Sequence, residues 1–203
     1  MTAPQDGTAV ARRQRTDARR NRERLVEAAR EAYAEAGPEA SLNEIARRAG
    51  VGPGTLYRHF PTRTELLTAV LRNRIETLCT RAVTLQEAAA AAAVHTAADD
   101  ALAEWLRAFL AHARVNQGLG GALMLEEPAA LGIDCHQLIL DAAAGMLTLA
   151  QRQGTARTDV SPADLLRLVT GIALSTARGD DLEEPDRLLG LVLDAVRRPD
   201  RRA

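Results

Sequence analysis

Hydrophobic residues recur every three to four positions along most of this chain, which is the spacing of helices that bury one face. The first such stripe begins near Asp17, runs through 25–36 and ends at Gly37-Pro38, because Pro cannot continue a helix. The segment Ser41-Leu42-Asn43-Glu44 then has the form of a capping box and predicts the start of a second, shorter helix.

A tight turn at Gly50 separates this second helix from a third, which Pro53 opens and Pro61 stops. Two short helices joined by such a turn predict a helix-turn-helix. Thr62-Arg63-Thr64-Glu65 is a second capping box, and it opens a long helix. The alanine run 88–93 either extends that helix or forms a linker, and the sequence leaves this open.

Further stripes predict helices from Thr96, around 122–126, across 134–152, from Ser161 and from Pro185, with an interruption at Gly118–Gly121. We therefore expect an all-α fold of about nine helices, with an N-terminal three-helix helix-turn-helix domain and a larger helical domain. The expected divisions are a disordered basic arm over 1–16, the helix-turn-helix domain over 17–61, and the larger helical domain over 62–203.

The composition is that of a globular protein: 203 residues, 46% hydrophobic and 26% charged, with a net charge of −1. No window approaches 18 uninterrupted apolar residues, so we expect no membrane span. The N-terminus lacks the apolar stretch of a signal peptide, and we expect a cytoplasmic protein. The two cysteines, Cys79 and Cys135, are too few for a disulfide framework or a zinc site, and we expect no metal or cofactor.

Charge is distributed unevenly along the chain. Residues 1–80 hold 14 Arg and 10 acidic residues, whereas 81–203 hold 12 Arg and 17 acidic residues. All 26 basic residues are Arg, and seven of them lie between Arg12 and Arg24. This asymmetry indicates either that the front of the chain meets a polyanion or that it carries a solvated basic tail.

The predicted third helix carries side chains suited to nucleic acid. Leu56 and Phe60 fall on its inward face, and its outer face offers hydroxyl, guanidinium and imidazole groups that can donate to phosphates and base edges. The outward residues are Thr55, Arg58 and His59, with Tyr57 on the flank. The alternative is that Tyr57 and His59 only complete the packing of a small domain.

The segment from Ser41 to Leu67, and above all the run G-V-x-x-x-T-L-Y-x-H-F from Gly50 to Phe60, resembles the DNA-binding domain of the TetR family of bacterial transcriptional regulators. The resemblance is dense over 20–67. The tail over 159–198 is similar to a C-terminal type common among actinobacterial members. The resemblance implies a homodimeric repressor that a small molecule releases from a double-stranded, (pseudo)palindromic DNA operator. It also implies that 17–61 is the DNA-binding domain and that 62–203 is the regulatory domain, which binds the ligand and dimerises.

Positions matching the family motif carry the implied DNA contacts. Thr55, Tyr57 and His59 correspond to phosphate contacts, and Arg63 lies near a further phosphate. Pro53, Gly54 and Arg58 lie where family members read bases, and Ser41 and Asn43 begin the second helix beside the backbone or a base. Gly52 stands where Ser is common, which would remove one phosphate contact. Arg12–Arg20 are candidates for the minor groove.

The last two helices, at about 162–178 and 185–198, are apolar on more than one face. Such helices pack against two neighbours or against a second chain, and the resemblance favours a homodimer through them. The middle helices hold the larger side chains, which are candidates either for an effector pocket or for ordinary core: Trp105, Phe109, His112, Met124, Cys135 and Ile139. Since no charged pair stands out, we expect a small and largely apolar effector.

Two other functions compete with this interpretation. An all-helical enzyme would need a catalytic group, but Cys135 and His136 are adjacent and point about 100° apart on a helix, so they form no nucleophile–base pair by themselves. We therefore expect no enzyme. A DNA-binding regulator without a small-molecule effector is the other alternative, and a thermal shift on addition of metabolites separates it from the first interpretation.

Overall fold

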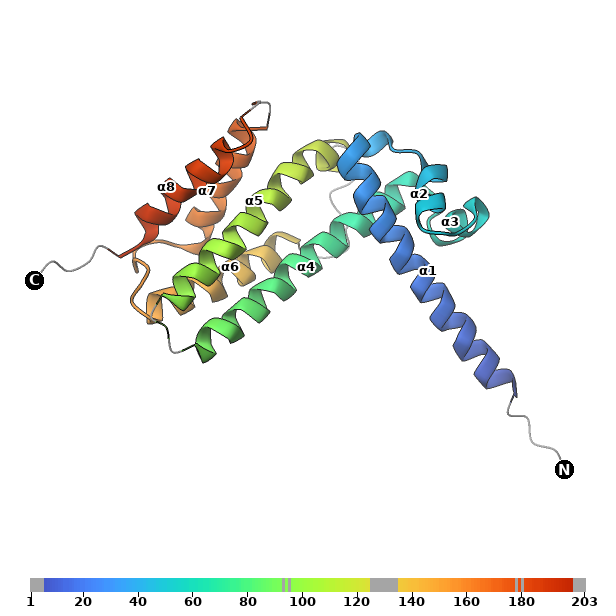
Figure 1. Ribbon diagram of the computed structural model, residues 1–203, viewed down its shortest axis with the longest axis horizontal. Coiled ribbons are helices and arrows are strands. Elements are labelled where there is room, and N and C mark those ends of the chain that lie inside the picture. The colour runs from blue at the N-terminus through green and yellow to red at the C-terminus, as the bar shows by residue number, and fades with distance from the viewer. Residues whose placement is uncertain are drawn as a thin grey trace, which may run out of the picture. The chain divides into compact units, whose positions relative to one another are not determined.

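The computed structural model describes residues 6–92, 94, 96–124, 135–177, 179 and 181–198, with the backbone alone for 6–14 and 116–124. Within these residues it contains eight α-helices, one short 3₁₀ turn and an isolated β-bridge between Ala156 and Arg197 (Figure 1). The helices are α1 (Asp6–Ala36), α2 (Leu42–Arg48), α3 (Pro53–His59), α4 (Arg63–Ala91), α5 (Ala97–Met124), α6 (Cys135–Arg152), α7 (Pro162–Ser175) and α8 (Glu184–Val196), and η1 (Gly37–Glu39) follows α1. The expected all-α fold is confirmed.

The chain divides into two compact units, Met1–Leu71 and Arg72–Ala203. We expected the division at 61/62, at the start of the long helix. The first turns of α4 group with the front unit instead, and their buried residues Leu66, Leu67 and Val70 do not belong to the apolar core of the rear unit. The alanine run is helical as far as Ala91.

In the front unit, α1 packs against both α2 and α3, and these helices bury Leu25, Ile45 and Leu56. The turn between α2 and α3 contains Gly50 at a φ of +65°, a backbone conformation that favours glycine. The Arg24 guanidinium also donates to the carbonyl of Ala49 beside this glycine, where a Cβ atom would collide with it. The predicted helix-turn-helix is therefore present.

Two expected helix boundaries were wrong. We expected a disordered arm over 1–16 and a helix from near Asp17. Residues 1–5 lie outside the described residues, and from Asp6 on the expected arm is part of α1. The segment 9–15 consists of Ala, Val, Arg and Gln, most of which are good helix formers, and an acidic residue suits the first turn.

We also expected an interruption at Gly118–Gly121 and a separate helix near 122–126. Instead α5 runs on to Met124, because glycine weakens a helix by only about 1 kcal/mol relative to alanine and keeps its hydrogen-bonding groups. Residues 125–134 lie outside the described residues.

In the rear unit, α5 packs against α6, α7 and α8, and α7 packs against α6 and α8. The buried Trp105 of α5 donates from Nε1 to the carbonyl of Leu78 in α4, with 3.0 Å between the two atoms. Ser161 and Asp164 form a complete capping box at the start of α7. Residues of α4 and α6 line an open groove in this unit.

Candidate nucleic-acid interface

Helix α3 is anchored by two apolar side chains and exposes most of the rest. Leu56 and Phe60 are 1% and 2% exposed, whereas Pro53, Gly54 and Arg58 are exposed to solvent. Thr55 and His59 are half-buried, and Tyr57 is 48% exposed. The protein's own atoms therefore leave the outer face of α3 open, which is what insertion into a DNA groove requires.

The Arg58 side chain lies back along its own helix. Its Nε donates to the carbonyl of Gly54 at 3.2 Å, and its Nη2 donates to Thr55 Oγ1 at 3.1 Å. Both partners lie at the start of α3, so the guanidinium and the threonine hydroxyl form one polar cluster on the exposed face. The cluster brings together two of the residues expected to meet DNA.

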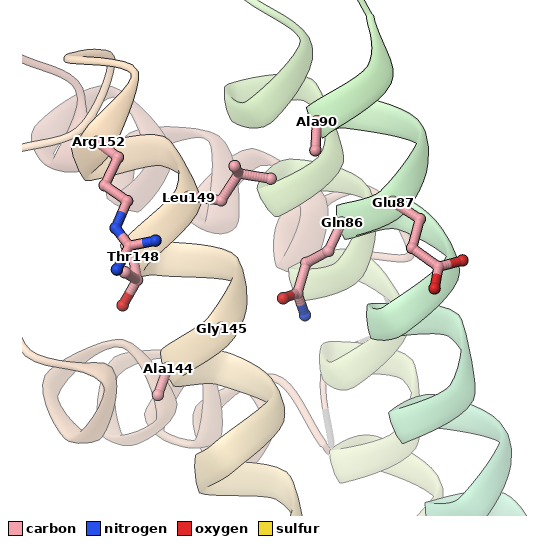
Figure 2. Close-up of a pocket in the computed structure, with 8 residues that line it drawn as sticks. All are labelled: Gln86, Glu87, Ala90, Ala144, Gly145, Thr148, Leu149 and Arg152. Carbon is pink, nitrogen blue, oxygen red and sulfur yellow. The ribbon is translucent and has the colours of Figure 1, made fainter.

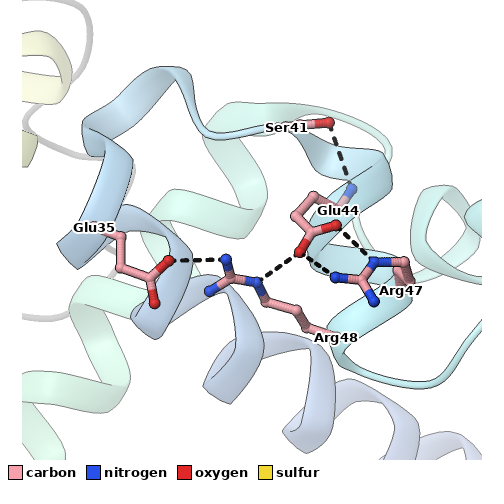
Figure 3. A network of polar contacts seen from close by, with 5 residues as sticks. All are labelled: Glu35, Ser41, Glu44, Arg47 and Arg48. Atoms are coloured by element: carbon pink, nitrogen blue, oxygen red, sulfur yellow. Dashed lines mark hydrogen bonds and ion pairs between the residues drawn. The ribbon is translucent and has the colours of Figure 1, made fainter.

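Helix α2 begins at Ser41 and is fixed by a network of ion pairs (Figure 3). The Ser41 hydroxyl accepts from the backbone N–H of Glu44 at 3.4 Å, as the capping box predicted. The Glu44 carboxylate does not complete that box but accepts hydrogen bonds from Arg47 and Arg48, which lower its pKa to about 2. Arg48 also pairs with Glu35 of α1 at 2.8 Å. Ser41 and Asn43 remain exposed at the start of the helix.

Arg63, expected near a phosphate, has partners within the protein. Its Nη1 donates to the carbonyl oxygens of Pro38 and Ala40 at 2.7 and 2.6 Å. These contacts tie the start of α4 to the 3₁₀ turn after α1. The phosphate contact of Arg63 stays a prediction. Its internal role could not be predicted from local patterns, because its partners lie more than twenty residues away.

Arginines on α1 extend the basic surface beyond α3. Arg15, Arg19 and Arg22 follow at spacings of four and three, so they share one face, and all three are exposed. The guanidinium carbon of Arg22 lies 5.1 Å from the ring centre of Phe60, at the end of α3. The arginine stripe (Arg15, Arg19 and Arg22) is therefore continuous with the end of α3.

The candidate effector residues lie mainly in the core of the rear unit. Trp105, Phe109 and His112 are at most 6% exposed and form a column, with ring centres 5.8 and 6.4 Å apart. Cys135 and Ile139 are half-buried on α6, and the side chain of Met124 lies outside the described residues.

None of these residues lines the groove of about 490 Å³ between α4 and α6 (Figure 2). The groove is lined by Gln86, Glu87, Ala90, Ala144, Gly145, Thr148, Leu149 and Arg152. The sequence patterns singled out none of its polar members, because surface polar residues on two separate helices give no periodic signal.

His112 predicts a pH dependence of stability. Burial, together with the nearby Arg74, lowers the pKa of His112 to about 4. Below the ordinary value near 6.5 the unfolded chain binds a proton that the folded chain does not. The free energy of unfolding should thus fall by up to about 3 kcal/mol as the pH drops from 6.5 to 4.

Urea titrations of the parent chain and of His112→Gln across this pH range measure the effect. We expect a shallower pH dependence in His112→Gln. The exposed His136→Gln should follow the parent curve. Parallel curves for the parent and His112→Gln would contradict the assignment.

Among the described residues no group of three or more His, Cys, Asp or Glu side chains could hold a metal ion, and none of the described helices is long and apolar enough to cross a membrane. Helix α3 is exposed and polar, and it follows α2 after a tight glycine turn within an all-helical fold. These features define a DNA-binding protein of the helix-turn-helix class.

Comparisons with known proteins place the chain within this class. Residues 25–70 match the bacterial regulatory proteins of the tetR family, and residues 97–198 match the C-terminal domain of SbtR-like transcriptional regulators. The chain belongs to the TetR family of bacterial transcriptional regulators, as its helix-turn-helix residues indicated.

Solved structures of TetR-family regulators resemble almost the whole chain, and two of them are more than 30% identical to it. A TetR transcriptional regulator from Streptomyces coelicolor is 35% identical with a TM-score of 0.75, and the match covers 88% of this chain and 99% of that one. A TetR regulatory protein from Mycobacterium vanbaalenii is 32% identical with a TM-score of 0.72, covering 91% and 99%. The regulator TtgW of Pseudomonas putida is 42% identical over 66 residues, which are 32% of this chain and 49% of TtgW. This chain thus spans only about half the length of that curated relative.

Proposed function

We propose that this regulator is a homodimeric repressor that binds a two-fold symmetric DNA operator in the cytoplasm and leaves it when a small effector binds. The exposed outer face of α3, with Tyr57 and Arg58 open to solvent, carries the proposal. TetR-family regulators bind DNA operators and small-molecule effectors as dimers, which supports the remaining parts.

The surface of α7 and α8 supports the homodimer. Leu168 and Leu174 on α7 are 51% and 61% exposed, and Leu191 on α8 is 61% exposed. Gly171 and Gly190 have open space where a Cβ atom would stand, so a second backbone could approach closely. Exposed leucines on two packed helices are typical of a surface that a second copy covers.

Ligand release requires that the effector bind more tightly to a conformer whose two α3 helices are wrongly spaced for the operator. Helix α4 begins in the front unit and continues as one helix into the rear unit. A movement of α4 is therefore our candidate for the transmission between the two sites. Crosslinking the two α4 helices of an operator-bound dimer should abolish release.

Selection of bound duplexes from a random pool, using the full chain, tests the DNA part. We expect enrichment of a sequence with two-fold symmetry whose half-sites lie about one helical turn apart or a multiple of it. Retention of the pool without an enriched sequence would overturn the proposal of a symmetric operator.

The arginine stripe should add phosphate contacts outside the half-site. Each phosphate contact changes the slope of log affinity against log salt concentration by about −0.9. The double variant Arg15→Ala/Arg19→Ala should therefore reduce the steepness of that slope by about 2 in each protomer and weaken binding to all duplexes alike. Operator titrations at several salt concentrations measure it.

Arg30→Ala is the matched control for the stripe, because Arg30 lies on the same helix, eight residues beyond Arg22, and pairs with Glu27 much as Arg19 of the stripe pairs with Glu23. Its salt slope should stay close to that of the parent chain. An unchanged slope in the double variant would remove the stripe from the DNA interface.

A further inference from the structure

The two cysteines of the chain come together between α4 and α6. Cys79 lies in the middle of α4, and Cys135 is the first residue of α6. The Cys79 thiol donates to the carbonyl of Leu138, with 3.6 Å between Sγ and the oxygen. Leu138 is less than one helical turn beyond Cys135, so the Cys79 thiol lies against the first turn of α6, which Cys135 begins.

The surroundings of the Cys79 thiol place the second sulfur nearby. Burial raises the pKa of Cys79, and the charges of Cys135 and Asp141 raise it further. Because the repulsion between two charges weakens with distance, this effect indicates that the Cys135 sulfur is close to that of Cys79. Both side chains are only half-buried, so a small solute can reach them from solvent.

The two thiols differ in their readiness to react. A thiolate, rather than a thiol, attacks an oxidant, and the raised pKa of Cys79 keeps its sulfur largely protonated at neutral pH. Cys135 begins α6, where the aligned peptide dipoles of the helix favour a negative charge. We therefore expect Cys135 to attack first and Cys79 to react with the product.

We propose that Cys79 and Cys135 are a peroxide-responsive pair that closes a disulfide between α4 and α6. The Cys135 thiolate attacks one oxygen of hydrogen peroxide, so an S–O bond forms, the O–O bond breaks, and the other oxygen leaves as hydroxide, which takes up a proton. Cys79 then attacks the Cys135 sulfur, the S–S bond forms, and the S–OH oxygen leaves as water with the Cys79 proton. Two electrons pass from the sulfurs to the peroxide.

This disulfide would tie α4 to the start of α6. The bond requires the two Cα atoms to stand about 4.4–6.8 Å apart, which fixes the helices more tightly than a thiol–carbonyl contact does. Helix α4 continues from the front unit into the rear unit, so we expect oxidation to shift α4 and weaken operator binding. This regulatory part rests on the proposed function, whereas formation of the disulfide does not.

Treatment of the full chain with hydrogen peroxide tests the disulfide. Thiol titration of the denatured protein and mass spectrometry are the measurements. We expect both thiols to disappear, the mass to fall by two hydrogen atoms, and dithiothreitol to reverse both changes. A non-reducing gel should show single chains. Retention of both thiols, or disulfides formed only between chains, would overturn the proposal.

Moving one thiol along α4 provides a matched control. The variant Cys79→Ser/Thr80→Cys keeps the number of cysteines but turns the α4 thiol by about 100° around the helix, at a position that is exposed. It should form the bond within one chain far more slowly than the parent. Equal rates in the variant and the parent would contradict the placement of Cys79 against α6.

Single substitutions test the order of the two steps. In Cys79→Ser the sulfenic acid of Cys135 has no second thiol in its own chain, so dimedone should capture it. In Cys135→Ser the remaining Cys79 should be labelled far more slowly. Equal labelling of the two variants would contradict the assignment of Cys135 as the attacking sulfur.

A separate readout distinguishes the disulfide from its regulatory use. Operator affinity of the oxidised parent should fall by about 5–150-fold, the usual range of coupling between two sites, and recover with dithiothreitol. Cys79→Ser/Cys135→Ser should keep its affinity in peroxide. Disulfide formation without a change in operator affinity, or an equal fall in this double variant, would overturn the regulatory role and leave the proposed DNA binding intact.

Discussion

A chain carrying Leu168→Glu and Leu191→Glu is expected to be monomeric and to lose operator binding. Both side chains are more than half exposed on α7 and α8, so the folded monomer should tolerate the change. In a two-fold interface each substitution occurs twice, and burying four carboxylates without partners opposes association strongly.

The monomer should lose DNA binding because it carries one α3 helix, whereas the dimer carries two that bind both half-sites of the operator together. Two sites joined in one molecule bind 10²–10⁴-fold more tightly overall than either site alone. Operator affinity of the double variant should therefore fall by at least about 100-fold at protein concentrations where the parent is dimeric. Sedimentation and operator titration on the same sample measure both effects.

Val83→Glu provides the comparison, since Val83 is 54% exposed but lies on α4 rather than on α7 or α8. It should remain dimeric and bind the operator. Circular dichroism of the double variant should retain the helical signal and a cooperative melt. A dimeric double variant with normal operator affinity would reject the α7–α8 interface.

Replacing Arg58 by Ala is expected to cost roughly 1–3 kcal/mol of operator binding and to relax sequence specificity. The guanidinium is exposed and held near the start of α3 by Gly54 and Thr55. These neutral partners are weaker than a base edge or phosphate that accepts two hydrogen bonds, so binding to DNA should displace them. Titrations with the selected operator and with single-base variants measure affinity and specificity.

Tyr57→Phe separates a phosphate contact from base reading. It removes a hydroxyl from a side chain that is 48% exposed, so it should weaken binding to every duplex alike while preserving sequence preference. Arg107→Ala removes an exposed arginine of α5 and should leave both quantities unchanged. Parental affinity in both Arg58→Ala and Tyr57→Phe would exclude the outer face of α3 from the interface.

Much of the front unit could be predicted because its signals are local. Gly37, Pro53 and Pro61 end or begin helices through effects that reach only a few residues along the chain. The spacing of apolar and polar residues along α3 and at its end likewise predicted that Leu56 and Phe60 are buried and that Arg58 is exposed. The same local rules failed at Gly118–Gly121, where the helix continues despite its glycines.

Residues with distant partners could not be assigned from the sequence. Arg63 carries the same charge whether it meets a phosphate or the carbonyls of Pro38 and Ala40, and only the fold brings those carbonyls to it. Gln86 and Gly145 are likewise unremarkable in sequence, since their meeting depends on how α4 and α6 pack.

The sequence by itself determined the family, the helical class and the helix-turn-helix, because periodicity, capping residues and the motif around Gly50 act over a few neighbouring positions. Only the tertiary structure decided that His112 is buried, that Arg63 is engaged inside the front unit, and that the Gln86 amide of α4 lies against Gly145 of α6. Burial and the meeting of distant side chains depend on the packing of whole helices, which no short stretch of chain encodes.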